Sequence, residues 1–168
     1  MNVNYLYCLL KQKKLSLEGG FTLVELLVVV IIIGILSAVA LPNLLGQVGK
    51  ARESEAKGNL GAIVHAQQVY HYEKKVFANT LEKLSISGTF TGEYYNYLDP
   101  DIANNSLVRQ KATSVDSTNN ITRDYAIGIY YNAGAYESTL CQAANTGATV
   151  EAPNSAGDPC TNGGFKIR

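Results

Sequence analysis

The sequence contains little cysteine, histidine or charge. Its 168 residues include three Cys and two His, and charged residues make up only 17%. So few thiols and imidazoles exclude a dense disulfide scaffold and leave little material for a metal site. Fourteen basic side chains balance fourteen acidic ones. This balance excludes a nucleic-acid binder that depends on bulk positive charge, and it excludes an acidic disordered chain.

The sequence also lacks the usual catalytic signatures. It has no C-x-x-C, P-loop or G-x-S-x-G motif, and its carboxylates are scattered singly. His65 and His71 are six residues apart, on different faces of a predicted helix, so they cannot bind one metal in the i, i+4 manner. Gly58 and Gly61 lack the Lys-Ser/Thr that a phosphate-binding loop needs. We predict that the chain is not an enzyme and uses no metal or cofactor.

The apolar residues are concentrated near the start of the chain. No charged residue occurs from Leu26 to Gly49, and the stretch Leu26–Leu41 is almost wholly apolar. About twenty apolar residues suffice to span the hydrocarbon core of a bilayer as a helix. A buried core strand of this length would be unusual. The stretch therefore predicts a membrane helix.

A short basic segment precedes this apolar run. It carries Lys11, Lys13 and Lys14, and it ends in a Gly19-Gly20 pair. A secretory signal peptide has its processing site after the apolar core, whereas this glycine pair comes before it. The alternative is an ordinary signal peptide cut at the A-x-A string of residues 38–40. The long uncharged tract and the helical pattern that continues past residue 40 favour the first interpretation.

Glu25 is a carboxylate at the head of the apolar run. Such a group costs about 2–3 kcal/mol in a membrane, so it indicates function unless it merely reaches the interface. Cutting the Gly20–Phe21 bond would create an α-amino group close to Glu25 in sequence. The two groups lie too close on one rigid helix to pair well with each other. A neighbouring subunit is the more plausible partner for each.

These residues resemble a known signature. The segment 19–30, GGFTLVELLVVV, is similar to the prepilin motif of type IV pilins and pseudopilins, and Gly34 and Pro42 also fall where that family has them. The stretch from Phe21 to about Lys57 resembles cyanobacterial pilins in particular. The resemblance implies that a prepilin peptidase cuts after Gly20 and methylates Phe21. It also implies that Glu25 neutralises the terminal amine of a neighbouring subunit during filament assembly.

The sequence then predicts three parts. Residues 1–20 form a leader, residues 21–75 one long helix, and residues 76–168 a globular β head. Within the helix, 21–45 is the transmembrane and filament-core part and 46–75 is amphipathic. Its predicted buried stripe is Leu45, Val48, Ala51 or Arg52, Ala56, Leu60, Ile63, Gln67 and Tyr70. Gly34 and Pro42 predict a flexible point in the helix; the alternative is that Pro42 ends it.

The head has the composition of a small β structure. Alternating segments predict strands at 93–98 and 123–131, with further strands near 107–113 and near the C-terminus. In the second segment, Tyr125, Ile127, Ile129 and Tyr131 share one face, which we expect to pack on the amphipathic half of the helix. The predicted fold is α+β: a long N-terminal helix, half membrane-embedded, on a small antiparallel sheet.

Cys141 and Cys160 are the cysteines that remain once Cys8 leaves with the leader. In a Gly/Asn/Pro-rich tail outside the membrane, they predict a disulfide that closes a C-terminal loop. Closing a loop of this size is worth about 3 kcal/mol. The alternative, two free thiols, would require a reducing compartment.

The predicted function is that of a type IV pilus subunit, which would serve motility, adhesion or DNA uptake. The alternatives are a pseudopilin of a type II secretion or competence system, and an uncut, signal-anchored extracytoplasmic binding protein. The resemblance implies several partners: further copies of the chain, the membrane, prepilin peptidase, minor pilins, the assembly platform and motor ATPases. The balanced charge does not support DNA as a partner. The precursor is expected in the plasma membrane and the assembled subunit in an extracellular filament.

Overall fold

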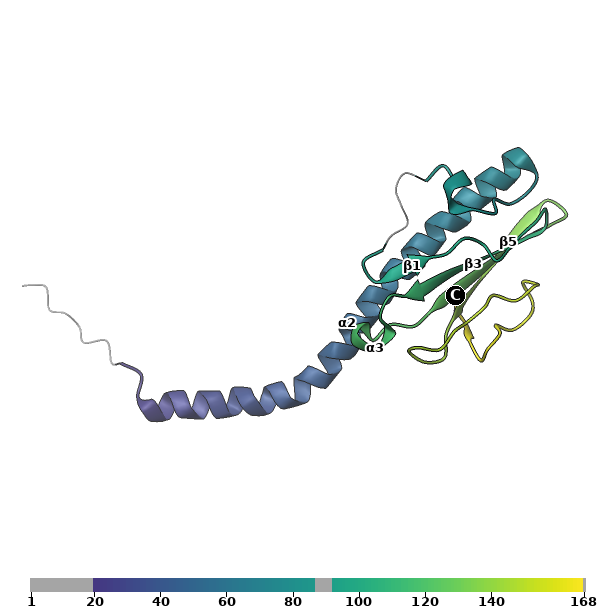
Figure 1. Cartoon of the computed structure of the whole chain (residues 1–168). Coiled ribbons are helices and arrows are strands. Elements are labelled where there is room, and N and C mark those ends of the chain that lie inside the picture. The colour runs from purple at the N-terminus through teal and green to yellow at the C-terminus, as the bar shows by residue number, and fades with distance from the viewer. Residues whose placement is uncertain (1–19, 87–91, 168) are drawn as a thin grey trace, which may run out of the picture. The chain divides into compact units, whose positions relative to one another are not determined.

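The computed structural model describes residues 20–86 and 92–167 (Figure 1). The long helix α2, Leu23–Lys74, is followed by a small antiparallel sheet, which confirms the predicted α+β class. The chain forms two compact units, one that ends at Pro42 and one that begins at Asn43. The leader predicted for residues 1–20 lies outside the described residues except for Gly20.

Beyond Glu25 in its first turn, the part of α2 in the first unit is almost wholly apolar. An 18-residue window of α2 has a mean hydropathy of 3.0 and none of it is buried, so this helix is long and apolar enough to cross a membrane. Large apolar side chains such as Leu26 and Leu36 are 60% and 65% exposed in the single chain. The helix continues through Pro42 rather than ending there. A bilayer or a bundle of helices can cover such a surface.

The second unit contains one six-stranded sheet. All strand pairs are antiparallel, in the order β1-β3-β4-β5-β6, and β2 pairs with β3. The elements after α2 are η1 (Leu81–Lys83), β1 (Tyr95–Tyr97), β2 (Ile102–Ala103), β3 (Leu107–Ser114), α3 (Ser117–Asn120), β4 (Tyr125–Asn132), β5 (Ala135–Gln142) and β6 (Phe165–Ile167).

Four of these strands confirm the predicted ones. β3, β4 and β6 lie where strands were expected, and β1 covers the middle of the predicted segment 93–98. β2 and β5 were not predicted. In β5 the first four residues are exposed or half-buried, so an apolar alternation is missing from the sequence.

One face of the sheet packs on the second half of α2 (Figure 1). The predicted helix residues Ala56, Leu60, Ile63 and Gln67 are all fully buried. They lie in one core with the predicted face of β4, namely Tyr125, Ile127, Ile129 and the partly buried Tyr131.

The predicted stripe is wrong at the start of this half of the helix. Leu45 and Val48 are 50% and 38% exposed, and Gly49 and Glu53 are buried in their place. The difference arises from tertiary contacts that the helix pattern does not show. Gly49 is covered by Ile121, and Glu53 is paired with Arg123, both of which follow α3 in the chain.

The opposite face of the sheet is covered by the C-terminal strap, which we define as residues 143–164. A second apolar cluster lies between strap and sheet: Ala126, Cys141, Ala143, Val150, Ala152 and Cys160. β4 is consequently buried on both faces over its first six residues. The strap and α2 thus cover opposite sides of the same central strand.

Candidate functional site

The predicted cleavage site lies just before the long helix. Gly20 and Phe21 are outside any helix or strand, and α2 begins at Leu23. Both residues are exposed, and the Phe21 side chain is 85% exposed. Within the described residues, and apart from the chain neighbours of Gly20, no heavy atom lies within 4 Å of the position that a Cβ would take there. The Gly20–Phe21 bond is therefore accessible and is not held in helical hydrogen bonds.

The predicted assembly residue Glu25 belongs to a capping box. Its Oε2 accepts hydrogen bonds from the backbone N–H and from the hydroxyl of Thr22, both at 2.9 Å. In return, the Glu25 N–H donates to Thr22 Oγ1 at 3.2 Å. This reciprocal pair satisfies two of the free donors at the start of the helix. Sequence reasoning missed Thr22, although the spacing Thr-x-x-Glu before an apolar run is the sequence signal of a capping box.

Gly34 and Pro42, the predicted points of flexibility, both lie inside α2. No side chain approaches the Cβ position of Gly34 within 4 Å. Proline has no N–H, so the carbonyl of Ala38 lacks its usual partner four residues on. The helix α2 continues through both positions.

Glu53 is a buried carboxylate that the sequence did not reveal as such. Only 4% of it is exposed, and its Oε1 accepts the Arg123 N–H at 3.2 Å and pairs with Arg123 Nε at 3.4 Å. Its Oε2 accepts from Gln142 at 3.3 Å. The negative charge is thus satisfied by Arg123, two residues before β4, and by Gln142 of β5. This arrangement fixes the sheet on the helix and has no free group for chemistry.

The disulfide between Cys141 and Cys160 is present and anchors the strap to β5, as predicted. Further contacts hold the strap between its ends. Tyr130 donates a hydrogen bond to the Pro153 carbonyl at 2.6 Å, and burial raises the pKa of Tyr130 to about 12. The Lys111 ammonium lies 2.7 Å from Glu151 and lowers the pKa of that carboxyl.

The two histidines have different surroundings. His65 is exposed, whereas His71 is buried against the rings of Phe77, Tyr131 and Tyr136. His71 Nε2 lies 2.9 Å from the Asn105 carbonyl, and Nδ1 lies 2.8 Å from the Tyr136 hydroxyl. Because a carbonyl only accepts, Nε2 carries a proton and donates to Asn105, and Nδ1 shares a hydrogen bond with the Tyr136 hydroxyl. Both ring nitrogens of His71 are therefore used in packing the end of α2.

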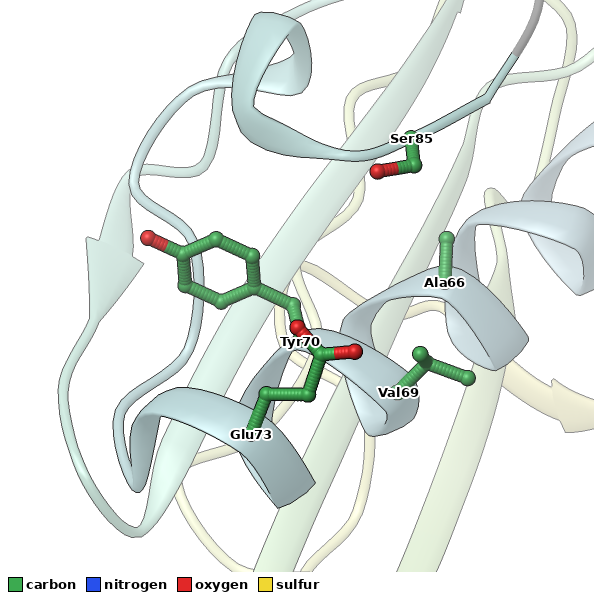
Figure 2. A pocket seen from close by; sticks show the side chains of 5 residues that line it. All are labelled: Ala66, Val69, Tyr70, Glu73 and Ser85. Carbon is green, nitrogen blue, oxygen red and sulfur yellow. The ribbon is translucent and has the colours of Figure 1, made fainter.

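A small hollow of about 160 Å³ lies beside the end of α2 (Figure 2). Figure 2 shows its lining, in which α2 contributes all residues except Ser85: Ala66, Val69, Tyr70, Glu73 and Ser85. The hollow holds one carboxylate and no histidine, thiol or second acid, so it does not make a catalytic set. Within residues 20–86 and 92–167, no group of three or more His, Cys, Asp or Glu residues could hold a metal ion.

Two family models match the chain in places that fit this geometry. The prokaryotic N-terminal methylation motif matches residues 15–41, which include the Gly20–Phe21 bond and Glu25. The family described as type IV pilin-like G and H matches residues 53–161, which include the C-terminal part of α2, strands β1 to β5 and most of the strap.

Three proteins with known roles are similar to part of the chain. The type IV major pilin protein PilA of Myxococcus xanthus is 38% identical over 93 residues, which are 55% of this chain and 42% of that protein. The type II secretion system core protein G of Vibrio cholerae is 40% identical over 68 residues, 40% of this chain and 47% of that protein. The fimbrial protein EcpC of Eikenella corrodens is 38% identical over 81 residues, 48% of this chain and 53% of that protein.

The matched region thus spans about half the length of each of these relatives. The longer match to the pilin-like model includes both the helix and the head, and it covers well over half of the chain. Together with the helix-on-sheet fold, this match identifies the chain as a member of the type IV pilin-like G and H family, whose proteins are structural subunits and not enzymes.

Proposed function

We propose that this protein is a structural subunit of a type IV pilus, assembled into an extracellular helical filament for motility, adhesion or DNA uptake. The observation that carries the proposal is the fully apolar, uncovered part of α2 directly after an accessible Gly20–Phe21 bond. A surface of this kind requires lipid or other apolar helices around it. Open-ended contacts between identical copies would provide those helices in a filament.

In this proposal the chain functions in two stages. Residues 1–20 are a leader that prepilin peptidase removes in the plasma membrane, after which Phe21 is methylated. The subunit is stored with residues 21–45 in the bilayer and the head outside. During assembly, Glu25 pairs with the Phe21 amine of a neighbouring copy, and Gly34 and Pro42 let the helix adjust. A platform protein, motor ATPases and minor pilins are the expected partners.

A pseudopilin of a type II secretion or competence system is the second candidate. Its support is the similarity to core protein G of Vibrio cholerae. That protein is 40% identical to this chain over 68 residues, whereas PilA of Myxococcus xanthus is 38% identical over 93 residues. The two candidates share the processing and assembly steps, and they differ in the length and location of the fibre.

Three measurements test the proposal. N-terminal sequencing of the mature protein should begin at N-methylated Phe21; a start at Met1 or Leu41 would overturn it. Electron microscopy and mass spectrometry of sheared surface fibres should find the chain in long filaments, whereas its absence from them would favour the pseudopilin. A Glu25→Ala variant should be processed without forming filaments, while Glu73→Ala, at an exposed acid of the same helix, should assemble normally.

A further inference from the structure

The short helix α3 is flanked by two exposed apolar residues. Val115 is 54% exposed and Ile121 is 41% exposed. The loop that carries them is closed at its base, where the hydroxyls of Ser114 and Thr122 lie 2.6 Å apart. We call residues 115–121 the foot loop. Its closure holds both apolar side chains at the surface of the head.

The backbone of the foot loop is strained at one of these residues. Ile121 has a φ of 55°, in the left-handed region that a β-branched residue rarely adopts. Strain of this kind persists only where the surroundings impose it. Here it keeps an isoleucine exposed at the end of α3, a position where glycine or asparagine would be the relaxed choice.

The foot loop is fixed to one turn of α2 (Figure 1). A Cβ at Gly49 would lie 2.6 Å from the Ile121 carbonyl oxygen, so glycine is what permits the close approach. Arg52 Nη1 donates a hydrogen bond to the Asn120 carbonyl at 3.1 Å. The loop therefore cannot move independently of this turn.

This turn follows closely on the apolar run. The path from Leu41 to Gly49 is eight residues of α2, or about 12 Å of helix. The large apolar residues within that path are exposed: Leu44 59%, Leu45 50% and Val48 38%. Between Leu41 and Gly49 the sequence of α2 carries no charge, and within the second unit its large apolar residues are exposed up to the turn that carries the foot loop.

The charges near the foot loop suit a lipid surface. The ammonium of Lys50, the residue after Gly49, makes no hydrogen bond or ion pair within residues 20–86 and 92–167. Lysine beside an apolar segment readily places its charge among lipid phosphates. Among the nearby acids, Glu53 pairs with Arg123 and Asp116 accepts from the Asn119 N–H at 3.0 Å, whereas Glu55 Oε1 is buried without a hydrogen-bond partner in the described part of the chain.

We propose that the foot loop inserts into the headgroup layer of the membrane while the subunit is stored there, with Val115 and Ile121 among the lipids and Lys50 on lipid phosphate. This inference rests on the membrane-stored stage of the proposed function. It adds a second contact with the bilayer, made by the head itself. The foot loop meets a lipid surface because the turn of α2 that it contacts follows, in sequence, apolar residues that already require lipid.

The absence of tryptophan from the sequence allows a direct test. Single tryptophans would be introduced into the full chain as Val115→Trp and Ile121→Trp, with Tyr72→Trp as the control at an exposed site of α2 and Val30→Trp as the reporter of the span. The proteins are reconstituted in phosphatidylcholine–phosphatidylglycerol vesicles with brominated acyl chains. Circular dichroism checks folding, and two foot positions guard against one variant failing to fold.

We expect bromine quenching of both foot-loop tryptophans to be at least twofold stronger than that of Tyr72→Trp, with blue-shifted emission. Strong quenching of Val30→Trp, together with quenching of the foot-loop tryptophans no stronger than that of Tyr72→Trp, would overturn insertion of the foot loop and leave membrane storage of the subunit intact. Unquenched Val30→Trp would overturn membrane storage as well. Foot-loop tryptophans that are shielded from water in filaments but not in vesicles would also overturn the proposal, because the foot loop would then contact a second copy of the chain and not lipid.

Discussion

Gln67 provides a sharp test of how the head is held on the helix. The side chain is fully buried; its Nε2 donates to the Ala78 carbonyl at 3.0 Å and its Oε1 accepts the Ala78 N–H at 2.9 Å. Gln67→Met keeps the volume and shape of the side chain and removes both bonds. Each of the two backbone groups left buried without a partner costs roughly 1–3 kcal/mol, so the loss of unfolding free energy should be roughly 2–6 kcal/mol.

The measurement is chemical unfolding of the full chain in detergent micelles, followed by circular dichroism and tyrosine fluorescence. The matched control is Gln68→Met at the next position, where the side chain is half-buried and makes no hydrogen bond in the described part of the chain. We expect the control to change the unfolding free energy by less than about 0.5 kcal/mol. An equally small change for Gln67→Met would refute the reasoning.

Three further outcomes follow from the head. Gly49→Ala should destabilise the head by about 1–2 kcal/mol in the same unfolding assay, because the new methyl group would clash with the Ile121 carbonyl oxygen. Gly58→Ala, which has open space around it, should stabilise the head by up to about 1 kcal/mol because alanine favours the helix. Reducing the disulfide should lower the unfolding free energy by about 3 kcal/mol, measured with and without reductant. Lys111 lowers the pKa of Glu151 below its ordinary value of 4.5 in the folded protein. The ionised carboxylate therefore stabilises the folded state above pH 4.5, and this stabilisation is lost as the pH falls through the lowered pKa. The difference in unfolding free energy between wild type and Glu151→Gln should accordingly vanish in acid.

Much of the fold could be predicted because its signals are local. The uncharged run, the periodic apolar residues up to Tyr70 and the alternation around Ile127 each depend on neighbours in sequence. The burial of Glu53 could not be predicted in this way. Its partner Arg123 is 70 residues away, and only the folded chain shows that a charge at this position is compensated.

The same distinction holds for the candidate site. The glycine, aromatic and glutamate residues that carry the resemblance to the prepilin motif stand in one short segment, so Gly20, Phe21 and Glu25 could be proposed directly from the sequence. Thr22 lies in the same segment, but its role depends on the free N–H groups at the helix start, which a pattern of charged and apolar residues does not show. The foot loop could not be found from sequence, since Gly49 and Ile121 meet only through the tertiary fold.

Strand β4 is covered by the helix on one face and by the strap on the other, so the assembly surface and the outer surface of the head lie on different sides of the sheet. One side of that strand meets the helix by which copies would associate, and the other meets a strap tethered by its own covalent link. Outward-facing positions of the strap can therefore vary without disturbing the helix–sheet core. A lineage could remodel the exterior of its fibre, residue by residue, and still polymerise it with unaltered machinery.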